Sequence, residues 1–132
     1  MRWRAYARLD FGDGERGSST VEFVIGAVLM VFMLLAIVQI SLYFHMRSVA
    51  TTAARHGVDR VRVVNGSAGA GITATNEFLN QAGSSLENRS VDATRSNELS
   101  SVTVGGQVVA VIPGLSLHIS VTANAPTERL VP

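Results

Sequence analysis

Apolar residues are concentrated in one stretch near the start of this 132-residue sequence. From Phe23 to Val38 no side chain is polar, and the stretch extends through Gln39 and Ser41 to Phe44, which makes 22 residues. As a helix they rise about 33 Å at roughly 1.5 Å per residue. The hydrocarbon core of a bilayer is about 30 Å thick. The pattern therefore predicts a transmembrane helix over about residues 23–44.

Two other interpretations of this stretch are open. It could be a buried helix of a soluble protein, although so short a chain has little material to cover it on all sides. It could also be a secretory signal, since Ser48-Val49-Ala50 resembles a small-residue cleavage site. A signal usually has an apolar core of about 7–15 residues, which is shorter than this one. A secreted protein would begin near Ala50 or beyond.

The helical pattern continues past the apolar stretch. Neither proline nor glycine interrupts residues 45–56, and we expect the helix to run on to residue 64. Its apolar and small residues recur near helical spacing and form a narrow face, which we expect to pack on the chain's own domain rather than on neighbouring helices. These residues are Met46, Val49, Ala50, Ala53, Gly57, Val61 and Val64.

A glycine-rich segment then separates this helix from a shorter one. Residues 65–71, NGSAGAG, predict the end of the first helix and a flexible joint. Residues 73–82 fit a short helix, which Gly83 should end.

The last third of the chain has the period of strands. Apolar and polar residues alternate over 115–123, and residues 102–104 and 108–112 predict two further strands. Gly105-Gly106 suits a two-residue hairpin turn, and Pro113-Gly114 suits a tight turn with glycine at positive φ. Residues 84–100 are polar and read as a loop, with room for one edge strand around Val91.

These elements together predict an α+β fold. A long N-terminal transmembrane helix continues into an extramembrane amphipathic helix, and a short helix and a small antiparallel β-meander follow. The meander has one apolar face, which the extramembrane helix should cover.

Composition argues against catalysis and against several kinds of ligand. The chain has no cysteine, and a net charge of +1 gives no field that would favour nucleic acid. His45, His56 and His118 have no carboxylate or second histidine at metal-ligand spacing. No nucleophile motif or paired acids occur. We therefore expect no enzyme activity, cofactor, metal or small-molecule substrate.

Glu22 is the unusual residue, because it stands at the start of the apolar stretch. One interpretation is a capping box, Ser19-Thr20-Val21-Glu22, with Ser19 as the N-cap and Glu22 at the third helical position. There the carboxylate would also lie near the positive end of the helix dipole. The other interpretation depends on the residues before and after Glu22, from Arg16 to Phe23.

The stretch RGSSTVEF covers residues 16–23. A polar, arginine-containing segment ends at Gly17, and the small residues Ser18 and Ser19 follow it. Glu22 is the fifth residue after the glycine, and Phe23 comes next. This resembles the class III signal of type IV pilin-like proteins, which a membrane aspartyl prepilin peptidase cuts after the glycine. More specifically, the chain resembles the TadE-like pseudopilins of the tight-adherence (Tad/Flp) pilus system. Residues 16–64 carry most of the resemblance.

The resemblance implies an organisation that charge alone does not give, because four arginines lie on either side of the stretch. Residues 1–17 would be a cytoplasmic leader, 18–64 the transmembrane helix and its extension, and 65–132 a small extracytoplasmic α+β domain. The protein would be single-pass in the bacterial inner (cytoplasmic) membrane.

The resemblance also implies a role for each carried-over residue. The prepilin peptidase would cut between Gly17 and Ser18, while Glu22, beside Phe23, would pair with the N-terminal amine of a neighbouring subunit. The partners would be the membrane, the peptidase, other pilin or pseudopilin subunits and the Tad assembly machinery. The alternative is an unprocessed bitopic membrane protein whose small extracytoplasmic domain binds a partner.

Overall fold

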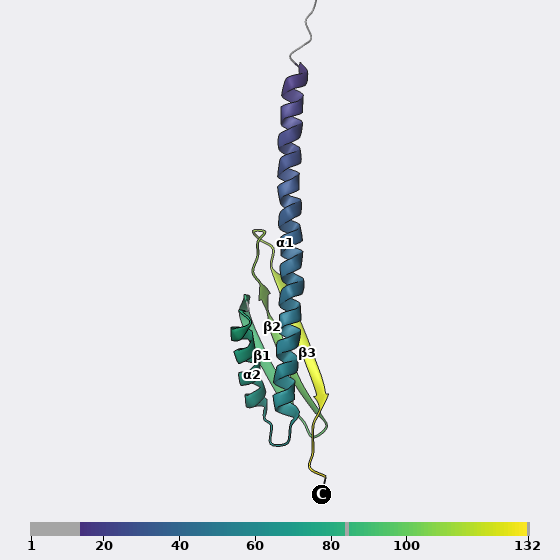
Figure 1. Cartoon of the computed structure of the whole chain (residues 1–132), viewed down its shortest axis with the longest axis vertical. Helices are drawn as coiled ribbons and strands as arrows, with labels where there is room; N and C mark the ends of the chain where they lie inside the picture. Colours follow the sequence, from purple (N-terminus) through teal and green to yellow (C-terminus); the bar gives the residue numbers. More distant parts are fainter. Residues whose placement is uncertain (1–13, 84, 132) are drawn as a thin grey trace, which may run out of the picture. The chain divides into compact units, whose positions relative to one another are not determined.

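The computed structural model describes residues 14–83 and 85–131, so most of the predicted leader, residues 1–13, lies outside it. The described part contains two helices and three strands (Figure 1). They are α1 (Gly14–Arg62), α2 (Ala68–Gln81), β1 (Leu86–Arg95), β2 (Leu99–Val108) and β3 (Leu117–Pro126). The predicted α+β class is confirmed. The chain divides into two compact units, Met1–Leu35 and Ala36–Pro132.

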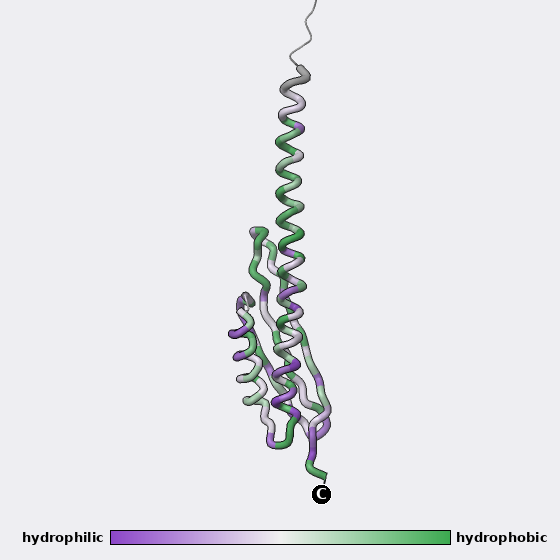
Figure 2. The backbone as a smooth tube through the Cα atoms, viewed as in Figure 1, coloured by the Kyte–Doolittle hydropathy of each residue, from purple (hydrophilic) through white to green (hydrophobic). Residues whose placement is uncertain are grey.

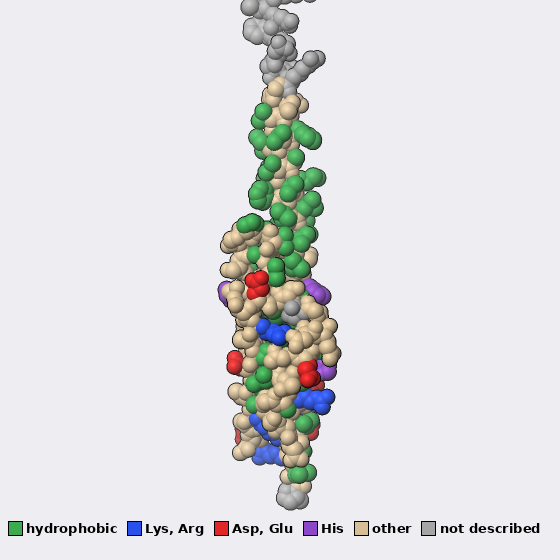
Figure 3. Space-filling view, turned by 90° about the vertical axis from the view of Figure 1, so that its left-hand side faces the viewer, with side chains coloured by type: hydrophobic (Ala, Val, Ile, Leu, Met, Phe, Trp, Pro, Cys, Tyr) green, Lys and Arg blue, Asp and Glu red, His purple; other side chains and the backbone are tan. Residues whose placement is uncertain are grey.

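The described part of the first unit is the N-terminal segment of α1. Every side chain described from residue 17 to residue 34 is exposed, and most are apolar (Figures 2 and 3). In the most apolar window of α1 only 6% of the residues are buried. A core helix of a soluble domain would be mostly covered, so that interpretation does not fit. α1 is long and apolar enough to cross a membrane, and the exposure of its apolar side chains fits a membrane anchor.

The second unit is a three-stranded antiparallel sheet with helices on one face (Figure 1). The strand order is β1-β2-β3, so each strand pairs with its neighbour in sequence. Across the sheet, Val91 pairs with Val104 and Val104 with Val121, which places these three side chains on one face. Thr103 and Thr122 pair on the other face, where their hydroxyls are 2.9 Å apart. The predicted meander is confirmed, with an apolar inner face and a polar outer face.

The core of this unit lies between the helices and the inner face of the sheet. The extension of α1 contributes small side chains, α2 contributes Leu79, and the sheet contributes mainly valines. The buried hydrophobic residues are Met46, Ala50, Ala53, Ala54, Val58, Val61, Leu79, Val102, Val104, Val108 and Ile119. The prediction that the extension of α1 packs on its own domain is therefore confirmed.

Small residues let α1 and α2 approach closely. A Cβ added to Gly57 would lie 2.0 Å from Thr75 Oγ1, and one added to Gly71 would lie 2.2 Å from Val61 Cγ2. Neither position has room for a side chain without a shift of its neighbours.

The predicted joint over residues 65–71 is only partly right. α1 ends at Arg62, but α2 already begins at Ala68, where the Ala70 N–H donates to the Oγ of the N-cap Ser67 (3.1 Å). Gly71 therefore lies inside a helix, where its small size serves the contact with Val61. The predicted stop is confirmed, since Gly83 follows α2 at φ 64°.

The predicted hairpin at Gly105-Gly106 is wrong. Both glycines lie inside β2, which contains the predicted strand 102–104 and ends at Val108. The second predicted strand, 108–112, is wrong beyond its first residue, because residues 109–112 lie in the connection to β3. β1 has a register shift between Glu87 and Ser90 beside these glycines. A Cβ at Gly105 would lie 2.8 Å from Ser90 Oγ, so the glycines accommodate a close strand rather than a turn. The Pro113-Gly114 turn is confirmed, with Gly114 at φ 81°.

The segment predicted as a loop over residues 84–100 contains all of β1 and the first two residues of β2. The edge strand expected around Val91 is present and is longer than its apolar pattern suggested. In β1 only Leu86, Val91, Ala93 and Arg95 are partly covered, which explains why the strand period is weak in the sequence.

Candidate processing and assembly site

The residues singled out by the sequence lie on the first turns of α1. Because this helix begins at Gly14, Ser19 is an interior residue and not its N-cap. The capping-box interpretation is therefore wrong for the intact chain. Glu22 lies more than two turns inside the helix, beyond the orphan N–H groups that a cap would satisfy.

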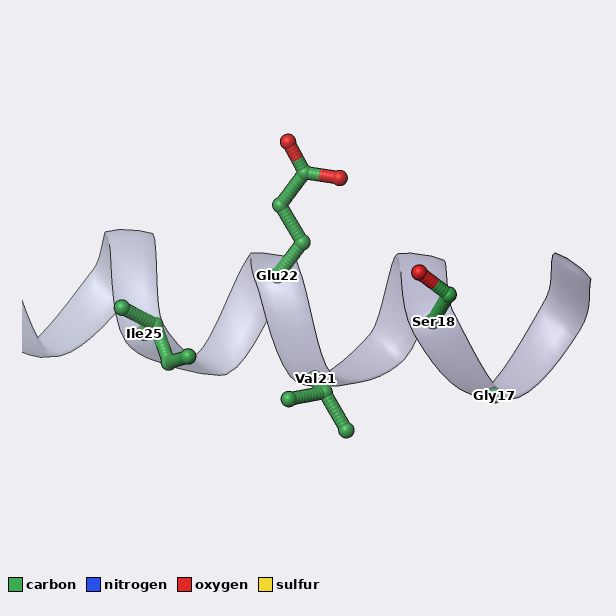
Figure 4. Close-up of a pocket in the computed structure, with 5 residues that line it drawn as sticks. All are labelled: Gly17, Ser18, Val21, Glu22 and Ile25. Carbon is green, nitrogen blue, oxygen red and sulfur yellow. The ribbon is translucent and has the colours of Figure 1, made fainter.

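Ser18 and Glu22 lie four residues apart, so they share one side of the helix. Figure 4 shows the Glu22 side chain extending away from the helix, while Val21 points to the opposite side. Ser18, Glu22 and Phe23 are all exposed, with Phe23 at 76%. The four predicted site residues, Gly17 included, thus form one accessible helical segment.

Gly17 has no packing reason to be a glycine. A Cβ built there would meet no described atom within 4 Å, in contrast to the crowded Gly57. Glycine inside a helix is less stable than alanine by roughly 0.5–1 kcal/mol. The packing of the described residues therefore does not require glycine at position 17, and Gly26 of the same helix is open in the same way.

Glu22 is also without an ion-pair partner among the side chains that the structure describes. The ion pairs there are those of Arg62 with Asp59 (2.9 Å) and with Glu128 (3.9 Å), in the other unit. An exposed carboxylate directly before an apolar, exposed helix is stable in water or at an interface. It becomes unfavourable by a few kcal/mol if it moves into lipid unpaired.

The three histidines lie elsewhere and are not brought together. His45 is exposed, the ring of His56 stacks on Phe78 with centroids 5.1 Å apart, and His118 Nε2 lies 2.7 Å from Gln107 Nε2. Within residues 14–83 and 85–131, no group of three or more His, Asp or Glu could hold a metal ion.

Gln39 is a residue whose role the sequence did not predict. It is 1% exposed, its Nε2 donates to the Val109 carbonyl (3.3 Å), and its Oε1 accepts from the Val111 N–H (2.7 Å). Its position in the sequence could have indicated a buried polar contact, because Gln39 is the first polar residue after sixteen residues without a polar side chain. Its side chain links α1 to the connection between β2 and β3.

Comparison with protein families gives one match. Residues 17–59 match the model of the family described as TadE-like protein, which confirms the resemblance over the segment from Gly17 into the extension of α1. The match does not include α2 or the sheet. Searches of curated proteins and of solved structures found no match. The matched segment is therefore similar to TadE-like proteins, and it contains the apolar stretch of α1 that fits a membrane anchor.

Proposed function

We propose that this chain is a minor pseudopilin, a structural or assembly component of a Tad pilus or a related secretion system. In this proposal α1 anchors it in the bacterial inner membrane, residues 1–17 are cytoplasmic, and the α+β unit is extracytoplasmic. A prepilin peptidase removes the leader by cutting between Gly17 and Ser18.

The observation that carries this proposal is the combination found at the start of α1. An open glycine, a small residue after it and an exposed glutamate precede a run of exposed apolar residues. What distinguishes Gly17 from the equally open Gly26 is its place, five residues before Glu22 and next to the small, exposed Ser18, where a peptidase can reach it. The family match supports the same system.

Cleavage would also give Glu22 a partner. The new α-amino group on Ser18 would lie about one helical turn from Glu22, on the same side of the helix. In an assembly, the amine of one subunit can pair with the carboxylate of the next. Pairing offsets the loss of a few kcal/mol that an isolated carboxylate suffers in an apolar setting, and it selects one axial register. An uncleaved chain has no such amine.

The N-terminus of the protein in its native membrane tests the cleavage. We expect mass spectrometry to find a chain that begins at Ser18 in cells with the peptidase, and a chain that keeps the leader in cells without it. If the leader, with Met1 or Arg2 at its end, persists in both, the protein is the unprocessed bitopic protein and the proposal is wrong.

A substitution at Glu22 tests the pairing separately. Glu22→Gln removes the charge with little change of shape, while Glu22→Asp keeps it and is the matched control. We expect both variants to be cut, and the Gln variant alone to lose recovery with partner subunits in crosslinked complexes. Equal recovery of both variants would show that charge pairing is not the role of Glu22.

A further inference from the structure

The connection between β2 and β3, residues 109–116, is apolar and uncharged. Its sequence is VAVIPGLS, and Figure 2 shows the hydrophobic colour at the tip of this connection. Val109 and Leu115 are each 38% exposed. The connection at the other end of β2 is the polar Ser96-Asn97-Glu98. The two ends of the sheet are therefore chemically different.

Several polar groups of this loop's backbone have partners within the chain. Gln39 accepts from the Val111 N–H and donates to the Val109 carbonyl, and the Leu115 N–H donates to the Ile112 carbonyl (3.2 Å). Pro113 has no N–H to satisfy. Non-helical backbone is tolerated at membrane depth only where its polar groups are satisfied inside the protein. These bonds satisfy four backbone groups of the loop, and the others need water or lipid headgroups, so the loop suits the outer boundary of a bilayer and not its hydrocarbon core.

Gln39 places the loop beside the outer end of the predicted membrane span. A helix crosses the hydrocarbon core with about 20 residues, and 20 residues counted from Phe23 end at Leu42. Gln39 lies within the last turn of that count. The first ionisable side chains that follow it on α1, apart from the phenol of Tyr43, are His45 and Arg47. If α1 spans the membrane over these residues, the loop lies at the level where lipid meets water.

From these observations we propose that residues 109–116 form a second membrane contact, which inserts Val109 and Leu115 into the outer boundary of the bilayer while Gln39 holds the loop against α1. The occupant of this surface is lipid, because the loop carries no charge and is bonded to Gln39, whose neighbours Val38 and Ile40 on α1 are exposed and apolar. The proposal rests on the membrane anchoring in the proposed function, and it needs neither cleavage nor pilus assembly.

Because the chain has no cysteine, single labels can test this in the full-length protein. Leu115→Cys and the matched control Asn97→Cys each receive a polarity-sensitive fluorophore and enter phosphatidylcholine vesicles. We expect the label at 115 to emit at shorter wavelength, to be quenched by nitroxide on the upper acyl chain, and to lose quenching by iodide. The label at 97 should show the reverse.

Two results would overturn the lipid contact. In one, iodide quenches the label at 115 as strongly as the label at 97. In the other, the label at 115 is shielded only at high protein-to-lipid ratio and is not quenched by the nitroxide lipid, so that a second copy covers the loop. A label at Met30→Cys reports the anchor independently. If Met30 is in lipid and Leu115 is in water, only this inference fails.

The role of Gln39 has its own variant. Gln39→Leu removes both side-chain bonds to the loop and keeps α1 apolar at this point. In the Leu115→Cys background we expect it to reduce quenching by the nitroxide lipid and to restore quenching by iodide, with the far-ultraviolet circular dichroism unchanged. Unaltered quenching would show that the loop enters lipid without Gln39 and would overturn that part of the proposal.

Discussion

Gly17 and Gly26 are a matched pair of glycines in α1. At both positions an added Cβ meets nothing within 4 Å. Leucine is a better helix former than glycine by roughly 0.8 kcal/mol, so neither Gly17→Leu nor Gly26→Leu should weaken the helix. We expect only Gly17→Leu to block cleavage, which an immunoblot of precursor and mature chains would detect. A block by both variants would indicate a general disturbance rather than a peptidase subsite.

Gly57 is the opposite kind of glycine. In Gly57→Ala the new methyl group would meet Thr75 Oγ1 at 2.0 Å and the Gly71 carbonyl at 3.1 Å. Overpacking of this kind typically destabilises by about 1–3 kcal/mol. Denaturant unfolding in detergent micelles should show that loss, and adding Thr75→Ala should recover part of it. A single variant as stable as the parent would mean that α1 and α2 separate easily.

At the residue scale, the sequence was enough to recognise the family resemblance, while the roles of Gly17 and Glu22 stay predictions. The distance from Gly17 to Glu22 and the apolar run after it are visible in one short segment, and the family match begins at Gly17. The bonds of Gln39 were not predictable in this way, because its partners at Val109 and Val111 are about 70 residues away in the chain. Only the folded sheet brings them together.

At the scale of elements, Arg95 at the end of β1 stabilises the end of α1. Its Nη1 donates to the carbonyls of Val61 and Val63, the latter at 2.8 Å. A cation there also opposes the negative end of the helix dipole. Since the site is partly exposed, we expect Arg95→Ala to lower the free energy of unfolding by about 1–2 kcal/mol.

Arg89 on the same strand is the control for that experiment. It is exposed and donates to the Asn80 side chain (3.0 Å), so Arg89→Ala should cost less than about 1 kcal/mol. Arg95→Lys should recover only part of the loss, because an ammonium group lacks the planar fork of the guanidinium. Equal losses at Arg89 and Arg95 in chemical unfolding would contradict the capping role.

The elements that were predicted well are those in which apolar residues recur at one regular spacing along the sequence. The helical pattern of residues 45–64 and the alternation of 115–123 reflect faces that are consistently buried on one side. β1 and the middle of β2 were poorly predicted for a different reason. The sequence Gly105-Gly106 is typical of a turn, but in the structure these glycines leave room for β1 beside its register shift. A register shift depends on how two strands pair, so the sequence of one strand does not predict it.

At the scale of the whole molecule, the second unit has its own core. All of the described buried hydrophobic residues lie at or after Met46, so a fragment of residues 36–132 should fold. We expect a dispersed NMR spectrum and a cooperative thermal transition. The matched fragment 56–132 lacks Met46, Ala50, Ala53 and Ala54, and it should stay unfolded. Similar spectra for both fragments would show that the extension of α1 is dispensable for the core.

The side chains of Gln39 and Arg95 have a mechanical consequence. Their hydrogen bonds join the extension of α1 to the sheet at two points, one just after the end of β2 and one at the end of β1. Along the helix these points are 22 residues apart, or about 33 Å. The strands run lengthwise beside this part of α1 (Figure 1). A force along the helix axis would therefore act parallel to the contact between α1 and the sheet. The hydrogen bonds of Gln39 and Arg95 would then carry the load at the same time and would not break one after the other.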